Sequence, residues 1–472
     1  MNRHTFDVAI LGAGTAGLSA RREVEKVTDN YVVIDAGTLG TTCARVGCMP
    51  SKVLIEVANR YHARHQMVDI GITNSEVLQL DPPAVMRHVR KLRDRFVRSV
   101  MGGIDAWRET HLLREYASFV DPHTLQVGDR QIRANSIIIA TGSRPILPKA
   151  WRPVQDLLID TNRFFELETI PQKMVVIGLG VIGLELGQAL HRLGVEVTAV
   201  GLGTALGALS DPEIQGYALE AFRAEFPIVT TGVKQLERHG DQLRVHTDEG
   251  VFEVDAGLLA IGRRPNLDRL GLDTIGLELD DKGIPLYSKH TQAIQGQPHL
   301  FIAGDANAER PLLHEAADQG RIAGYNAVHH PHQCFVKRTM LAVTFSEPGI
   351  ALVGQRYADL VAAGTDFVTG AVSFEGQGRA IVKLQEKGLL HVYVHRTSGM
   401  LLGAEIFAPQ AEHLAHLLAW AIERQVDIWG ALAFPFYHPV LEEGLRTALR
   451  AAAEQVAQRP PELELMRCGD LF

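Results

Sequence analysis

The chain has 472 residues, more than one hydrophobic core usually supports, so about three domains are expected. Its formal net charge of -8 comes from 47 basic and 55 acidic residues, and no block of Lys or Arg predicts a nucleic-acid or membrane surface. No apolar run reaches the roughly 18 residues of a membrane span, and the first apolar stretch ends in glycines, unlike a signal peptide, so we expect a cytoplasmic protein.

The first predicted elements form a strand–turn–helix unit. An apolar strand at residues 6–11 runs into Gly12-Ala-Gly-Thr-Ala-Gly and then into a helix. Glycines with this spacing permit a tight turn, and the helix N-terminus offers free N–H groups to a pyrophosphate. A second strand at residues 31–34 ends in Asp35, whose carboxylate is placed to accept ribose hydroxyls. An ordinary glycine-rich turn is the alternative. The predicted contacts of this dinucleotide site are Gly12, Gly14, Gly17 and Asp35.

A close pair of cysteines, Cys43 and Cys48, follows this unit. Pro50 fits the first turn of the next helix and so places Cys48 at a helix N-terminus, where the dipole and free amides lower the pKa of a thiol. With Gly47 between them, the two cysteines can close a small disulfide ring. Two unconnected buried cysteines are the alternative. Zinc pairs sit closer together and need further ligands, so no metal site is predicted.

The same strand–turn–helix pattern is repeated at Met174-Val-Val-Ile-Gly-Leu-Gly-Val-Ile-Gly, which predicts a second dinucleotide site. Gly201 stands as far after Gly178 as Asp35 stands after Gly12, so the second site has no carboxylate for the ribose. The segment after Gly201 also offers no Arg or Lys to a 2′-phosphate. We favour NAD and do not exclude NADP. The glycines predicted to contact this nucleotide are Gly178, Gly180 and Gly183.

Three more strand-then-turn segments follow the pattern of buried strands that feed loops. Asp305, at the end of the last one, is suited to a ribityl hydroxyl of a flavin or to capping the next helix. Beyond about residue 334 an alternating strand at 390–394 precedes helices at 411–424 and 442–457, typical of an α+β unit. The residues predicted to bind a cofactor in these turns are Thr141, Gly142, Gly262, Arg263, Gly304 and Asp305.

In this order the motifs resemble the pyridine nucleotide-disulfide oxidoreductase family over essentially the whole chain, and most closely its dihydrolipoyl dehydrogenase branch. The resemblance implies an α/β fold with two Rossmann-like dinucleotide-binding domains and a C-terminal α+β dimerisation domain, bound FAD and NAD, and a homodimer whose active site spans both subunits. The implied domains are FAD-binding (1–147), NAD(P)-binding (148–265), the second part of the FAD-binding or central region (266–335) and the interface (336–472).

The resemblance also assigns roles by position. Cys48 resembles the thiol beside the flavin and Cys43 the thiol that meets the substrate. Lys52 and Glu185 resemble the pair beside flavin and nicotinamide, although Lys52 also fits a first-turn pair with Glu56. The resemblance makes one further pair the catalytic base and its orienting partner, His438 and Glu443.

The implied reaction is oxidation of a dihydrolipoyl group, free or on a carrier protein, with NAD. Reduction of glutathione disulfide or another disulfide is an alternative, and so is a non-catalytic redox sensor that binds nucleotides. Mercuric reduction is less favoured because that branch has a C-terminal vicinal cysteine pair, whereas Cys468 stands alone; Cys468 and Cys334 are interpreted as ordinary thiols. Arg45, Val440 and Gly201 depart from the family pattern.

Overall fold

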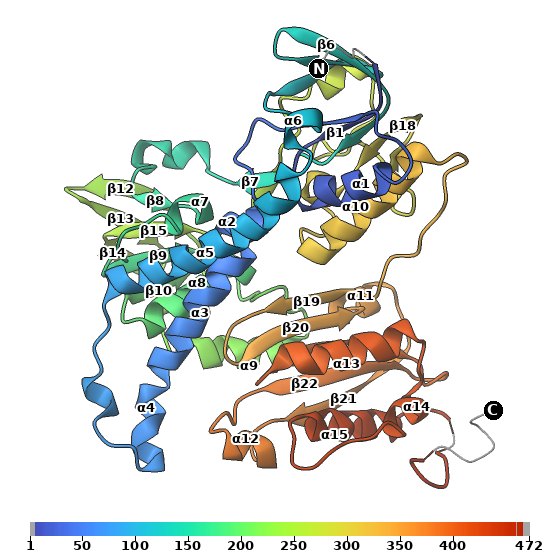
Figure 1. Cartoon of the computed structure of the whole chain (residues 1–472). Coiled ribbons are helices and arrows are strands. Elements are labelled where there is room, and N and C mark those ends of the chain that lie inside the picture. The colour runs from blue at the N-terminus through green and yellow to red at the C-terminus, as the bar shows by residue number, and fades with distance from the viewer. Residues whose placement is uncertain (1–4, 459, 466–472) are drawn as a thin grey trace.

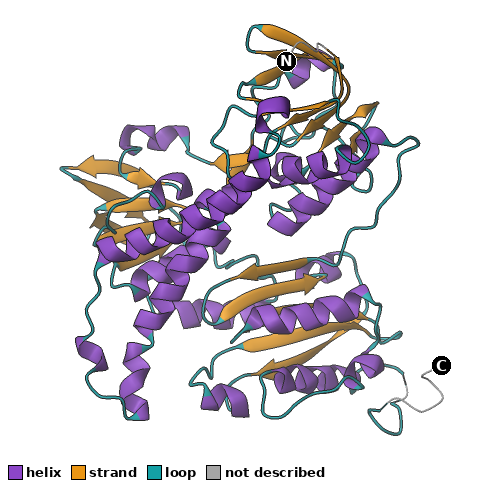
Figure 2. Cartoon of the chain, in the orientation of Figure 1, coloured by secondary structure: helices purple, strands orange, loops and turns teal. Residues whose placement is uncertain are grey.

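The computed structural model describes residues 5–458 and 460–465, which form three large sheets with helices packed against them (Figures 1 and 2). This is the mixed α/β architecture that the sequence predicts. Among the described residues, none of the helices combines the length and the apolar character that crossing a bilayer requires.

The first sheet contains eight strands, and its central strands are buried on both faces and pair in parallel. Helices α1 (Thr15–Val24) and α10 (Leu313–Val328) pack on one face. They approach closely because a Cβ on Gly320 would lie 2.1 Å from the carbonyl oxygen of Ala16. The strands are, in spatial order, β17 (Ala293–Ile294), β18 (Gln297–Ile302), β6 (Arg130–Ile139), β1 (Thr5–Leu11), β2 (Tyr31–Ile34) and β3 (Leu112–Leu113), with β4 (Ala117–Asp121) and β5 (Thr124–Val127) joined through β6.

The second sheet has five parallel strands and lies between the two halves of the first in the sequence. Its order is β11 (Ile228–Val229), β10 (Glu196–Val200), β9 (Lys173–Ile177), β15 (Ala256–Leu259) and β8 (Leu158–Ile159). An antiparallel side sheet and a two-stranded ribbon accompany it: β12 (Gln235–His239), β13 (Gln242–Thr247) and β14 (Gly250–Val254), and β7 (Ser143–Pro145) with β16 (Arg263–Pro265). The ribbon pairs β7, which follows β6 of the first sheet, with β16, which follows β15 of the second sheet.

The third sheet is antiparallel throughout, in the order β19 (Leu341–Thr344), β20 (Gly349–Gly354), β23 (Leu401–Ala408), β22 (Leu389–His395) and β21 (Phe367–Ser373). Its apolar core includes side chains of α13 (Ala411–Glu423) and α15 (Glu442–Ala453). Helix α15 ends at Ala453, earlier than the predicted end at residue 457. Beyond the helix, the amide of Ala457 donates to the carbonyl of Arg396 (2.8 Å).

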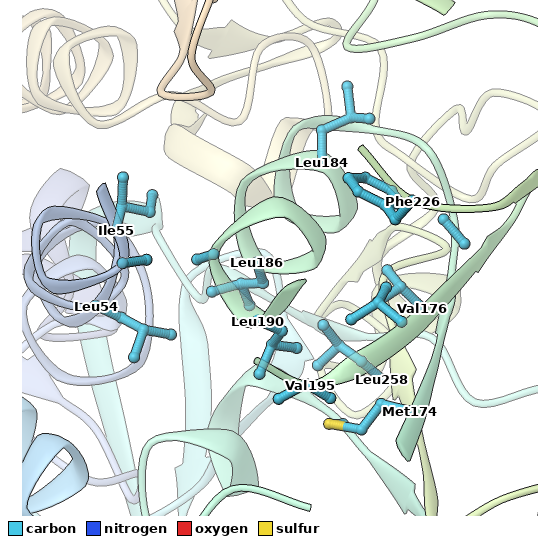
Figure 3. Close-up of a cluster of buried hydrophobic side chains, with 14 of the residues drawn as sticks. Leu54, Ile55, Met174, Val176, Leu184, Leu186, Leu190, Val195, Phe226 and Leu258 are labelled. Atoms are coloured by element: carbon cyan, nitrogen blue, oxygen red, sulfur yellow. The ribbon is translucent and has the colours of Figure 1, made fainter. Parts of the chain in front are cut away.

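Helix α3 (Cys48–His62) connects the first sheet to the second. Ser51, Leu54, Ile55 and Ala58 are buried on one face of α3 at helical spacing. Leu54 and Ile55 belong to the same apolar cluster as Leu186 and Leu190 of α8 (Val181–Arg192), and Figure 3 shows Leu54 pointing toward these two leucines. The packing brings the start of α3 beside the start of α8. The remaining helices are α2 (Thr42–Val46), α4 (Arg64–Met67), η1 (Val68–Ile70), η2 (Ser75–Val77), α5 (Pro82–Asp105), α6 (Arg108–His111), η3 (Lys149–Val154), α7 (Thr161–Phe164), α9 (Pro212–Arg223), η4 (Leu272–Ile275), η5 (Gly304–Asn307), α11 (Tyr357–Ala362), α12 (Gly378–Val382) and α14 (Ile428–Leu432).

Candidate active site

The two glycine-rich turns have the same geometry. A Cβ on Gly12 (φ 112°) would lie 2.3 Å from the carbonyl oxygen of Ala140, and a Cβ on Gly178 (φ 115°) would lie 2.3 Å from that of Ala260. The third glycine of each turn would place a Cβ 1.8 Å from the carbonyl oxygen of the first. Only glycine fits these positions, so both helices lie close against their strands.

The middle glycines, Gly14 and Gly180, differ from the others because a Cβ there would meet no atom within 4 Å. Each is the N-cap of its helix, and neither provides a side-chain cap. The space beside each of these glycines is therefore open, and the positive partial charge of the adjoining helix N-terminus suits a pyrophosphate. Both turns fit a dinucleotide.

The first turn is completed by Asp35 at the end of β2. Its Oδ2 accepts a hydrogen bond from the amide of Ala13 (2.7 Å), and its Oδ1 accepts one from Gly37 (2.6 Å). These bonds fix the carboxylate at the mouth of the first turn, where a ribose can reach it. Gly201 occupies the corresponding place in the second turn, which has no carboxylate.

A polar network lies where β6 and β18 end. Ser143 Oγ donates to Asp305 Oδ2 (2.7 Å), and Arg263 donates to Ser143 Oγ (2.8 Å) and to its carbonyl (2.7 Å). Burial lowers the pKa of Arg263. Thr141 Oγ1 is buried with no hydrogen-bond partner in the described structure, so a polar ligand group beside it fits this site. Sequence reasoning missed Ser143, although it directly follows the Thr141-Gly motif.

Asp305 does not cap the following helix. It lies in η5, whereas the N-cap of α10 is Leu312, so the capping alternative is wrong. The nearby glycines have positive φ and give the turns their shape: Gly142 (67°), Gly262 (106°) and Gly304 (70°).

The two cysteines lie on successive short elements. Cys43 lies in α2, whose N-cap Thr41 accepts a hydrogen bond from the amide of Ala44 (3.3 Å), and Cys48 is the first residue of α3, as predicted. A Cβ on Gly47 would lie 3.3 Å from the Cα of Cys43, so the glycine lets the two helices approach. Both cysteines are free thiols in this structure.

The two thiols have opposite tendencies to ionise. The hydrogen bond from Cys43, together with the positive charge of Lys52, lowers the pKa of Cys48 to about 7. The same hydrogen bond, together with burial, raises the pKa of Cys43. The sequence predicted a lowered pKa for Cys48 from the helix N-terminus, whereas the main cause is the neighbouring thiol. Above a pH of about 7 the pair therefore carries one proton on Cys43 and one negative charge on Cys48.

Lys52 reaches Glu185 of α8 rather than Glu56. Its Nζ lies 2.9 and 2.8 Å from the two carboxylate oxygens, while Glu56 pairs with Arg60, so the first-turn alternative for Lys52 is wrong. Phe345, which the sequence did not single out, donates its amide proton to Glu185 Oε1 (2.9 Å), and its ring centroid lies 4.7 Å from the Lys52 nitrogen. The residue after β19 thus holds both members of the pair.

His438 and Glu443 form the predicted pair. His438 Nδ1 lies 3.0 and 3.1 Å from the carboxylate oxygens, and this contact lowers the pKa of Glu443. Because a carboxylate only accepts, Nδ1 carries the proton and Nε2 is free to take another. Val440, a departure from the family pattern, also donates its amide proton to Glu443 (3.2 Å).

One chain does not bring His438 and the cysteines together. The His438 side chain is 81% exposed. Helix α15, which begins shortly after it, lies well apart from α2 in Figure 1. A complete set of thiols and base within one subunit is therefore not formed.

The other two cysteines are the ones interpreted as ordinary thiols. Cys334 is an exposed free thiol, and Cys468 lies outside the described residues. Within residues 5–458 and 460–465, no group of three or more His, Cys, Asp or Glu side chains is placed to hold a metal ion. Arg45, which lies in α2 between the two cysteines, is half-buried, and its Nε makes no hydrogen bond among the described residues.

The chain is similar in sequence to known proteins of one family over most of its length. Residues 6–320 match the model of the pyridine nucleotide-disulphide oxidoreductase family, and residues 340–449 match the dimerisation domain of that family. A dihydrolipoyl dehydrogenase of Thermus scotoductus is 29% identical over 464 residues, which cover 96% of this chain and 98% of that protein. A mercuric reductase of Staphylococcus aureus is 28% identical over 453 residues, covering 94% and 82%.

The fold is similar to that of a solved flavoprotein as well. The HOCl-induced flavoprotein disulfide reductase RclA of Escherichia coli, solved as a Cu(II) complex, superimposes with a TM-score of 0.81. The sequences are 19% identical, and the match covers 95% of this chain and 100% of that chain. This likeness concerns the fold alone.

Proposed function

The chain belongs to the pyridine nucleotide-disulphide oxidoreductase family, and we propose that within it the protein oxidises a dihydrolipoyl dithiol with NAD through Cys43 and Cys48. It is an FAD-containing oxidoreductase that uses a pyridine nucleotide, as members of this family are. The observation that carries the proposal is geometric: Cys43 in α2 and Cys48 at the start of α3 adjoin across Gly47, one helical turn before Lys52 and its partner Glu185.

The residues that would hold FAD are those of the first glycine turn together with Asp35, Thr141 and Asp305, and the second glycine turn would hold the nucleotide. Bound FAD supplies two-electron transfer between the dithiol and the nucleotide. Lys52 places a positive charge beside Cys48 and favours its thiolate. Glu185 and Phe345 hold that lysine in place.

The thiol chemistry is an exchange in which atoms and electrons balance. A substrate thiol gives its proton to His438 Nε2, and the thiolate attacks Sγ of Cys43 in the oxidised Cys43–Cys48 disulfide. The disulfide breaks, and Cys48 leaves as a thiolate, which its lowered pKa favours. The second substrate thiol then attacks the first substrate sulfur, which closes the substrate disulfide, and its proton passes to Cys43, which leaves as a thiol. The substrate loses two electrons, and the cysteine pair gains them.

His438 is proposed to act on the cysteines of the partner subunit. Its exposure in the single chain and the match to a dimerisation domain both support a homodimer in which each active site takes residues from two chains. Glu443 keeps the proton on Nδ1 and so leaves Nε2 as the base.

The lipoyl substrate is supported by several relatives named dihydrolipoyl dehydrogenase, including one from rat mitochondria that is 31% identical. Reduction of another disulfide by a reduced nucleotide is the second candidate, because Arg45 beside the cysteines is unlike the family pattern and bears an unpaired, half-buried guanidinium Nε.

Steady-state turnover separates the two candidates. We expect faster turnover on dihydrolipoamide with NAD than on glutathione disulfide with NADPH, and loss of turnover in Cys43→Ser. The reverse ranking in protein of full FAD content would reject the lipoyl assignment and leave the dithiol chemistry standing. Retained turnover in Cys43→Ser would reject both.

A further inference from the structure

The two nucleotide turns differ at one pair of positions. In the first turn the middle residue of Gly-x-Gly is Ala13, and its amide donates to the carboxylate of Asp35 (2.7 Å). In the second turn the corresponding residues are Leu179 and Gly201. A small residue beside a carboxylate is thus replaced by a large apolar residue beside a glycine. The first turn therefore shows which carboxylate contact the second turn lacks.

Leu179 fills the space that a side chain at position 201 would need. A Cβ on Gly201 would lie 2.5 Å from Leu179 Cγ and 2.6 Å from its Cδ1. The Leu179 side chain blocks the space for a side chain at position 201. The backbone of Gly201 would accept one, because its φ lies outside the left-handed region. A carboxylate at position 201 therefore requires Leu179 to move or to become smaller.

Leu179 is not free to move. It is 5% exposed and packs in the core cluster that also contains Leu206 and Leu209. The segment that bears these leucines folds back, and the amide of Gly207 donates to the Leu179 carbonyl (3.0 Å). Leu179 is therefore packed in the core through its side chain and tied through its carbonyl to the segment that follows β10.

The segment after β10 offers no charge to a ribose. Residues 197–210 contain no Asp, Glu, Lys or Arg, and Leu202, directly after Gly201, is 88% exposed. Its neighbour Gly203 is tied to the Thr230 carbonyl (2.7 Å), which holds the segment at the end of the sheet. A ribose 2′-hydroxyl finds no carboxylate on this segment, and a 2′-phosphate finds neither a repelling carboxylate nor an attracting cation.

We propose that Leu179, packed over Gly201, keeps a carboxylate out of the second nucleotide site, so that this site binds NAD and NADP with similar affinity. The nucleotide is then recognised by the start of α8, which binds its pyrophosphate, and by apolar contact with Leu202. This inference deepens the proposed function by naming the nucleotide class; it rests on the family's nucleotide site and does not depend on the thiol substrate.

The test is direct binding of NAD and NADP to FAD-loaded protein by titration calorimetry, which needs no turnover. A charge-assisted hydrogen bond changes affinity about 10- to 150-fold. We expect the two dissociation constants to differ by less than about tenfold, and a larger difference in either direction would overturn the proposal. Loss of lipoyl turnover with this ratio unchanged would count against the proposed substrate only.

Rebuilding the first turn's pair in the second gives the sharper test. The double variant Leu179→Ala, Gly201→Asp is expected to prefer NAD over NADP at least about tenfold. Gly201→Asp alone is expected to bind both nucleotides more weakly, because the new side chain meets Leu179. An equal gain of preference in the single variant, or none in the double variant with full FAD content, would overturn the role of Leu179.

A matched control is Glu249→Gln. Its Oε1 accepts the amide of Thr230 (3.1 Å) on the neighbouring strand end, so it removes a carboxylate near the same segment. The proposal expects an unchanged ratio of affinities, and a shift toward NADP of more than about tenfold would instead assign the ribose carboxylate to Glu249.

Discussion

Lys52 and Glu185 lie far apart in the sequence and form an ion pair of 2.8 Å between the starts of α3 and α8. The pair exists because Leu54 and Ile55 of α3 pack on Leu186 and Leu190 of α8 (Figure 3). Glu185 is only 4% exposed, so its charge depends on Lys52 and on the amide of Phe345.

Removing the charge of Glu185 should therefore destabilise the junction of the two nucleotide units. Glu185→Gln leaves Lys52 without its carboxylate, and we expect a loss of about 1.5–3 kcal/mol, seen as a lower thermal midpoint of the FAD-loaded protein. Glu56→Gln is the control, because the Glu56–Arg60 pair is exposed and should shift the midpoint little. Equal shifts in the two variants would contradict the structural role of Glu185.

The ionisation of Cys48 should depend on a proton donor at position 43. Cys48 is a thiolate above its pKa of about 7, so its thiolate absorbance should disappear as the pH falls through that value. Cys43→Ala removes the donor and should raise this pKa, whereas Cys43→Ser keeps an O–H donor and should leave it low. The measurement is a pH titration of reduced protein at the thiolate band. An identical midpoint in Cys43→Ala and Cys43→Ser would mean that position 43 does not set the pKa.

A site shared between subunits predicts complementation. A positioned base contributes about 10²- to 10⁴-fold, so His438→Gln should lose that much turnover, and Cys43→Ser should lose turnover as well. Co-expressed as heterodimers, the two variants should regain turnover, because one of the two sites then has both the cysteines and His438. Heterodimers that stay as inactive as the parents would place the base and the thiols in the same chain.

The buried contact between the N-terminus of α9 and the third sheet should weaken in acid. Burial tends to raise the pKa of Asp211, but hydrogen bonds from His391 (2.8 Å) and Tyr393 (2.9 Å) hold it below its usual range. A carboxyl with a lowered pKa contributes stability above its ordinary pKa of 3.8, and that stability is lost as the pH falls through the lowered value.

Asp211→Asn should therefore cost about 1–3 kcal/mol at neutral pH and progressively less below pH 4. Thermal midpoints of wild type and variant across this pH range check the expectation. Asp366→Asn, which alters an exposed pair with Arg396, is the control and should have little effect at any pH. A constant difference between wild type and Asp211→Asn down to pH 3 would contradict the linkage.

Much of the fold could be predicted because its signals are local. The glycine turns, the strands that precede them and the helix that starts at Cys48 follow from spacing and backbone chemistry. Asp35 follows from its place at a strand end. These features depend on residues that are close together in the sequence, so the sequence alone is enough to predict them.

The contacts that determine the chemistry are not local. Lys52 fits Glu56 by helical spacing, and only the packing of α3 on α8 shows that Glu185 is its partner. Phe345 reaches that pair from the third sheet through its backbone amide, which leaves no trace in the residue type. Leu179 over Gly201 is a matter of shape, and the sequence revealed only that a carboxylate was missing.

The central claim is that Cys43 and Cys48 exchange electrons with a flavin held by the first nucleotide turn. Anaerobic addition of one two-electron equivalent of dihydrolipoamide to the oxidised holoprotein tests it most directly. We expect a new long-wavelength absorbance from a thiolate beside the flavin in wild type and none in Cys48→Ser. No such band in wild type, or an undiminished band in Cys48→Ser, would contradict the account.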